Sequence, residues 1–79
     1  MSFTPEQIEE AAMLTHFNLS SQREGLKVHS NAEPAQIEAT KRLFEKGLVT
    51  QADGGYLTSL GSHAAEHAQA LLRVLSVKD

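Results

Sequence analysis

The first residues of the chain carry the pattern of an amphipathic helix. Thr4 and Gln7 have the spacing of a capping box around a proline, which is favoured in the first helical turn. Phe3 and Ile8 stand where a hydrophobic staple would place them. We therefore predict a helix over residues 5–17. The expected inner face is Ile8, Ala11, Ala12 and Thr15, and the expected outer face is Glu6, Glu9 and Glu10.

The next segment, residues 18–33, has a weaker pattern that leaves helix and strand both open. Residues 20–25 fit a one-turn helix that begins at a serine and ends at a glycine. Residues 26–29 alternate apolar and polar side chains, which is typical of a short strand with Leu26 and Val28 facing inward.

A second helix is predicted from Pro34 to Lys46. Glu33 takes the cap position, because the residue before a proline avoids the helical region of backbone space. Gly47 ends the helix, and Lys46 complements the negative end of the helix dipole. The expected inner face centres on Thr40, with Ile37, Leu43 and Phe44 around it.

The sequence after this helix predicts a two-stranded hairpin. Residues 48–51 and 56–58 are β-prone and stand on either side of Asp53-Gly54. Tight hairpin turns need positive φ angles, which glycine and aspartate tolerate. A threonine cap then opens a long helix over residues 59–77.

This order of elements resembles the recognition helix and wing of repressors of the multiple-antibiotic-resistance (MarR) class, over residues 34–65. The resemblance implies a winged-helix-like α+β domain over residues 1–79: helix, short strand, helix, two-stranded wing and long C-terminal helix. Residues 19–33 depart from it, because they offer at most one turn where a supporting helix is expected. The resembling stretches are Leu43-Phe44-Glu45-Lys46-Gly47-Leu48-Val49 and Leu57-Thr58-Ser59-Leu60-Gly61.

Over its whole length the chain is similar to a small uncharacterised bacterial family whose members are described as DNA-binding. The resemblance implies a transcriptional regulator that contacts double-stranded DNA. The stretches that carry it are Gly25-Leu26-Lys27-Val28-His29, Lys46-Gly47-Leu48-Val49-Thr50, Asp53-Gly54-Gly55-Tyr56-Leu57-Thr58 and Ala64-Ala65-Glu66-His67-Ala68.

The composition of the chain excludes several classes of protein and argues against DNA binding. The net charge is −3, and the isoelectric point of 5.7 is well below the value of about 9 that is usual for nucleic-acid-binding domains. The chain has no cysteine, which excludes disulfides and thiolate metal sites. No apolar run approaches the roughly 20 residues of a membrane span, and the first residues lack a secretory signal. We therefore expect a cytoplasmic protein.

The charged face of the second helix has two interpretations. If it reads a DNA groove, Gln36, Lys41 and Arg42 contact bases, and Lys27 and Lys46 contact the phosphate backbone. If it is an ordinary solvated face, Glu38 pairs with the bases three and four residues later. In that case the chain is a protein–protein interaction module that keeps the winged-helix shape without binding DNA.

The last helix contains a motif with the spacing of a zinc site. His63-Ala64-Ala65-Glu66-His67 has the spacing of inverted zinc peptidases, and two histidines four residues apart share a helix face. A catalytic zinc needs a third protein ligand, and Asp79 is the only acid after His67. We therefore expect no metal site, no cofactor and no enzymatic activity.

The apolar residues of the last helix cover more than half of its circumference. A helix that packs on a single core needs a stripe of only about 100°. The surplus is explained either by a helix held between the first helix and the sheet of one monomer, or by a homodimer through residues 64–77. The expected interface residues are Ala64, Ala68, Leu71, Leu72 and Leu75.

Overall fold

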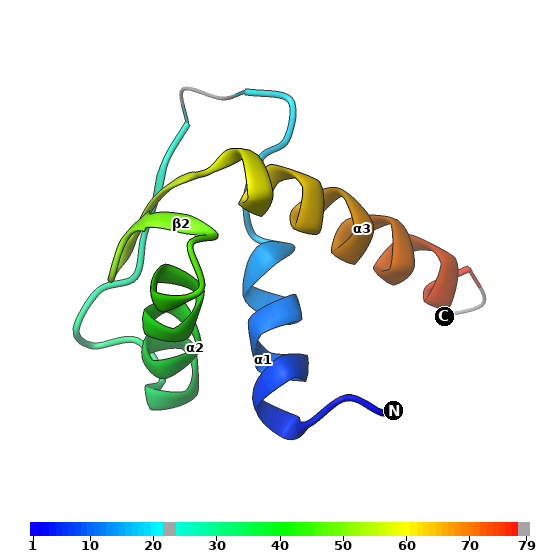
Figure 1. Ribbon diagram of the computed structural model, residues 1–79, viewed down its shortest axis with the longest axis horizontal. Coiled ribbons are helices and arrows are strands. Elements are labelled where there is room, and N and C mark those ends of the chain that lie inside the picture. Colours follow the sequence, from blue (N-terminus) through cyan, green and yellow to red (C-terminus); the bar gives the residue numbers. More distant parts are fainter. Residues whose placement is uncertain (22–23, 78–79) are drawn as a thin grey trace.

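The computed structural model describes residues 1–21 and 24–77 and shows an α+β domain of three helices and a three-stranded antiparallel sheet (Figure 1). The predicted order of helix, short strand, helix, hairpin and long helix is confirmed. The elements are α1 (Pro5–Leu14), β1 (Leu26–Lys27), α2 (Pro34–Glu45), β2 (Val49–Gln51), β3 (Gly54–Leu57) and α3 (Ser59–Leu75).

Local cap chemistry sets where the helices begin. The backbone N–H of Gln7 donates to the Thr4 hydroxyl at 3.0 Å, and the Gln7 side chain accepts from the backbone N–H of Thr4 at 3.0 Å, so the predicted capping box is confirmed. Thr58 caps α3 by accepting from the Gly61 N–H at 3.0 Å. Helix α1 ends at Leu14 rather than at residue 17, because the chain turns at Thr15 to bring Phe17 into the core.

The sheet has the strand order β1-β3-β2, so the last strand of the hairpin is the central one. Leu26 pairs with Gly55 and Lys27 with Gly54, while Gln51 also pairs with Gly54 across an irregular register. The hairpin is therefore confirmed, but its glycines lie in β3 and not in the turn, which is formed by residues 52–53. A Cβ on Gly54 would lie 2.3 Å from the Leu26 carbonyl oxygen, so this position accepts only glycine.

The segment between α1 and α2 contributes strand β1 to the sheet. Leu26 and Val28 are half-buried against the core, as predicted, and the Val28 N–H donates to the Asp53 carbonyl at 2.8 Å. The predicted one-turn helix at 20–25 includes residues 22–23, which lie outside the described residues. Within residues 24–33 there is no helix, and the chain enters α2 directly through a turn.

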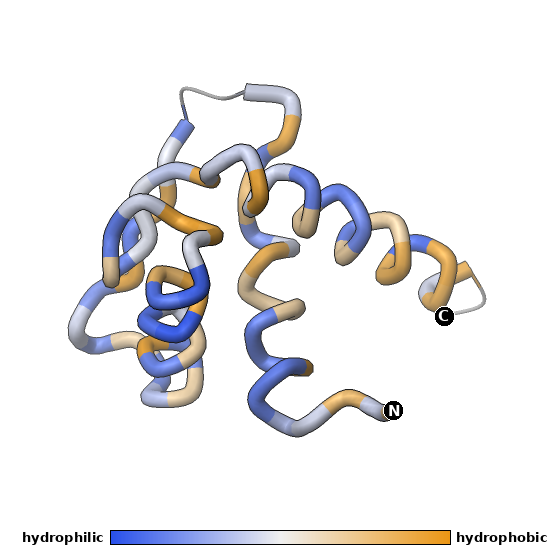
Figure 2. The backbone as a smooth tube through the Cα atoms, viewed as in Figure 1, coloured by the Kyte–Doolittle hydropathy of each residue, from blue (hydrophilic) through white to orange (hydrophobic). Residues whose placement is uncertain are grey.

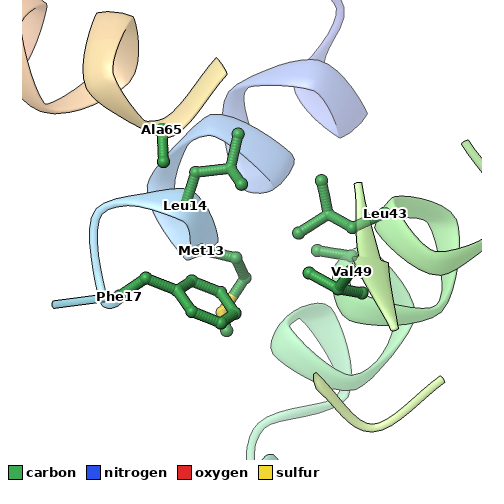
Figure 3. Packing of buried hydrophobic residues seen from close by; sticks show 7 residues of the cluster. Met13, Leu14, Phe17, Leu43, Val49 and Ala65 are labelled. Atoms are coloured by element: carbon green, nitrogen blue, oxygen red, sulfur yellow. The ribbon is translucent and has the colours of Figure 1, made fainter. Parts of the chain in front are cut away.

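The core forms where α1, α2, α3 and the hairpin meet (Figure 3). Helix α1 packs against both other helices, with α2 on one side and α3 on the other (Figure 1). The buried apolar residues are Met13, Leu14, Phe17, Ala39, Leu43, Val49 and Ala65.

The predicted inner face of α1 is wrong at Ile8 and Ala12, whereas Ala11 and Thr15 are half-buried. Ile8 is 56% exposed and Ala12 is exposed, whereas Glu10 is only 6% exposed. The buried face continues the spacing of Met13, Leu14 and Phe17 back by one turn, and that turn places the Glu10 side chain against α2.

The predicted inner face of α2 is right in its centre and wrong at its edge. Thr40 and Leu43 are buried as predicted, but Phe44 is 45% exposed and Ala39 is completely buried. The buried face is rotated toward Ala39 because α1 and the sheet both pack against this helix. The small side chain of Ala39 allows α1 to approach α2 closely.

Helix α3 is attached to the domain from its first turn to Ala70 and not beyond. A Cβ on Gly61 would lie 1.8 Å from the Leu48 carbonyl oxygen, so the first turn rests directly on the chain before β2. Further on, the Gln69 amide donates to the carbonyls of Phe17 at 2.8 Å and Leu14 at 3.3 Å. Beyond Ala70 every described residue of α3 is exposed, and Figures 1 and 2 show this end projecting from the body. We call residues 71–75 the α3 overhang.

In the part of the chain that the structure describes, no helix combines the length and apolar character required to cross a membrane.

Candidate functional site

Basic side chains at the C-terminal end of α2 bind acidic side chains of α1. The Arg42 Nε donates to the Glu10 Oε2 at 2.8 Å, and the Arg42 Nη2 lies 3.3 Å from the Glu9 Oε1. The same Nη2 also donates to the Glu6 carbonyl at 3.3 Å. The Lys46 Nζ pairs with the other oxygen of Glu10. We call Glu9, Glu10, Arg42 and Lys46 the Glu10 cluster.

Glu10 is the centre of this cluster, because both of its carboxylate oxygens are occupied. Burial alone would raise the pKa of Glu10, but hydrogen bonds from Lys46 and Arg42 and their positive charges lower it below its ordinary value of 4.5. The hydrogen bond to Glu10 likewise raises the pKa of Arg42. The carboxylate is therefore ionised at neutral pH and holds the two bases against α1.

The five residues predicted to contact DNA lie in three separate places. Arg42 and Lys46 meet at Glu10, whereas Lys41 pairs with Glu38 within α2 at 3.3 Å, as the spacing predicts. Gln36 and Lys27 both line a shallow hollow of about 180 Å³ beside β1. The structure therefore does not gather the five side chains on one face of α2.

The hairpin tip shows no basic side chain. Asp53 is half-buried in the turn, and its carbonyl accepts from the Val28 N–H. Tyr56 is 47% exposed, and its ring lies next to the backbone of Gly25. The tip of a DNA-contacting hairpin usually offers cations to phosphates, and this one offers an acid.

The two histidines of α3 lie together on the helix surface. The rings of His63 and His67 are 4.7 Å apart between centroids and meet edge to face, and both residues are exposed. Among the described residues, no group of three or more metal-ligating side chains converges, here or elsewhere.

The residues predicted to form a dimer interface differ in their exposure. Ala64 and Ala68 are half-buried and pack against the core of their own chain. Leu71, Leu72 and Leu75 belong to the α3 overhang and are 48%, 50% and 68% exposed.

The Glu10 cluster was missed by the analysis of the sequence, although a signal for it exists. Glu10, Met13, Leu14 and Phe17 are spaced i, i+3, i+4 and i+7, which is the spacing of a single buried helix face. An acid on such a face needs a cationic partner, and Arg42 with Lys46 has the i, i+4 spacing that allows both bases to reach one carboxylate.

The chain was compared with known proteins at the level of families, curated proteins and solved structures. Among curated proteins and among solved structures, no match is found. Residues 1–76 match the model of a family of unknown function, DUF5669, and the chain belongs to that family.

Proposed function

We propose that this chain is a non-catalytic protein–protein interaction domain of the cytoplasm that keeps a winged-helix-like layout without reading DNA. The observation that carries the proposal is the Glu10 cluster. Arg42 and Lys46, two of the five bases and amides predicted to contact DNA, are bound to an acid of their own chain.

Releasing these bases to a phosphate would cost stability. Glu10 is only 6% exposed, so removing its partners would leave a carboxylate that is poorly solvated and unpaired. Glu9 and Glu10 would also remain close to the incoming phosphate and repel it. The net charge of −3 also repels the phosphates of DNA at longer range.

The α3 overhang supports an interaction function directly. Its three leucines are about half to two-thirds exposed and adjoin the half-buried Ala68. Contiguous exposed apolar side chains on a small domain are typical of a contact surface for another macromolecule.

A DNA-binding regulator of winged-helix type is the second candidate. It is favoured by the element order, in which α2 leads into the β2–β3 hairpin and a third strand pairs beside it. Lys27 and Lys41 are exposed and would have to supply the phosphate contacts.

A salt-titrated mobility shift on random-sequence duplex DNA tests the proposal. We expect no shift even at about 50 mM salt, where nonspecific binding by bases is strongest. A shift that weakens with salt and is lost in the Lys27→Ala/Lys41→Ala double variant would overturn the proposal in favour of the DNA-binding candidate. Glu38→Ala, which removes the acid beside Lys41, is the matched control and should not reduce such a shift.

A further inference from the structure

We infer that the partner of the α3 overhang is a second copy of this chain, so that the domain is a homodimer through the C-terminal half of α3. The inference rests on the proposed interaction function and names its partner. It is carried by the continuity of one apolar stripe, by the surface area of the chain and by the lack of charge on the overhang.

One stripe of α3 runs from the core of the domain onto the overhang. Gly61, Ala65, Ala68, Leu72 and Leu75 alternate spacings of four and three residues, which keeps them on one face of a helix. Gly61 and Ala65 are buried and Ala68 is half-buried, whereas Leu72 and Leu75 on the same stripe are 50% and 68% exposed. The face that packs against the core therefore continues beyond the point where the chain itself can cover it.

The area of the molecule indicates how much surface is left uncovered. A compact monomer of 8.6 kDa exposes about 4,700 Å² by the usual relation between mass and surface. This chain exposes 5713 Å², an excess of about 1,000 Å². A stable interface buries about 800 Å² on each partner, and the excess, which the overhang shares with the exposed N-terminal segment, is of that size.

The overhang has the chemistry of a homodimer contact. Arg73 is its only charged residue, and it lies about 160° around the helix from Leu75. Interfaces between identical chains are more apolar than those between chains that also exist alone. A two-fold contact also places the same patch on both copies, so that neither copy leaves its leucines in water.

Further apolar side chains are exposed near the start of α1. The two helices meet near the end of α1 and diverge from there, and the N-terminal segment lies on the same side of the molecule as the end of α3 (Figure 1). Phe3 and Ile8, at the start of α1, are 66% and 56% exposed. These side chains add to the exposed apolar surface of the chain.

Light scattering coupled to size-exclusion chromatography tests the inference on the full chain. We expect the wild type to have twice the mass of one 8.6 kDa chain, with dissociation on dilution. The Leu72→Gln/Leu75→Gln variant should have the mass of a single chain with unchanged helical circular dichroism, because both leucines are exposed in the monomer. Val74→Gln is the matched control: Val74 is 67% exposed and lies about 160° around the helix from Leu72 and about 100° from Leu75, and this variant should stay dimeric.

The contrary outcomes separate the two proposals. A wild type that is monomeric at every concentration, or a dimer that survives Leu72→Gln/Leu75→Gln, would overturn the homodimer through α3. A monomer that binds neutral phospholipid vesicles through the leucines would assign the face to lipid instead. These outcomes leave the proposed interaction function open to its own test. A mobility shift of duplex DNA by the wild type would overturn that function, whether the chain is a monomer or a dimer.

Discussion

At the scale of single residues, Glu10 determines how α1 is joined to α2. It belongs to α1, yet its two oxygens are held by Arg42 of α2 and by Lys46, the residue that follows α2, both more than 30 residues away in the sequence. Because the carboxylate is buried and its partners are partly exposed, the pair costs less to form than a fully buried one. Glu10 thus fixes α1 on α2 and keeps two bases away from other ligands.

Glu10→Gln should destabilise the domain in a way that depends on pH. At pH 7 we expect a loss of about 1–2 kcal/mol in the free energy of unfolding, because the charge that holds Arg42 and Lys46 is removed. The folded-state pKa of Glu10 lies below 4.5, so its contribution is fully present above that pH and is lost as the pH falls through the folded-state pKa. Urea unfolding of both proteins from pH 7 down to pH 3 measures the difference.

The control for this prediction is Glu38→Gln, which removes an exposed pair with Lys41. Exposed pairs contribute little, so we expect a change below about 0.5 kcal/mol with little dependence on pH. A difference between wild type and Glu10→Gln that stays constant from neutral to acid pH would contradict the role assigned to Glu10.

At the scale of elements, the contact between α3 and the chain before β2 sets the direction in which α3 leaves the body. The first turn of α3 lies against the Leu48 backbone, and the Thr58 hydroxyl donates to the Gly47 carbonyl at 2.6 Å while it caps the helix. The position of Gly61 therefore determines how the overhang projects.

Gly61→Ala should destabilise the domain although alanine is the better helix former. The new methyl group would meet the Leu48 carbonyl at 1.8 Å, and backbone cannot move away as a side chain can. We expect a loss of about 1–3 kcal/mol, which exceeds the gain in helix propensity. Thermal unfolding measures it, with Ser62→Ala as the control for propensity alone. Equal or greater stability of Gly61→Ala would show that α3 does not approach Leu48 so closely.

The elements themselves were largely predictable because their signals are local. The capping box at Thr4, the proline that opens α2 and the cap at Thr58 each depend on residues within one turn. The glycines of the hairpin were also recognised, but their place in β3 depends on the approach of β1 from a distant part of the chain. Sequence spacing alone does not show that approach.

The faces of the helices were harder to predict, because they depend on which elements pack together. On α1, Ile8 and Ala12 are as apolar as a buried face requires, and they compete with the face formed by Met13, Leu14 and Phe17, whose spacing also includes Glu10. On α2, the spacing of Arg42 to Glu38 predicts a pair within the helix, but Arg42 instead binds α1. The spacing indicates that an acid on the buried face of α1 needs a cationic partner, but it does not show which distant residue supplies it.

At the scale of the whole molecule, the domain is small and its core is made of few side chains. Among the residues that the structure describes, seven apolar residues are buried, and two of them are alanines. Domains of this length gain little stability from one core and usually need further support. Because the chain has no cysteine, a disulfide cannot supply this support. In the proposed homodimer, a second copy supplies it by binding the α3 overhang.

The most direct test of this account is the dependence of the melting temperature on protein concentration. If the overhang is covered by a second copy, a hundredfold rise in concentration above the dissociation constant adds about 2.7 kcal/mol per dimer, which raises the melting temperature by roughly 5–10 °C. We predict this rise for the wild type and for Val74→Gln, and its absence in Leu72→Gln/Leu75→Gln. A wild type that melts at the same temperature across the whole range would contradict the account.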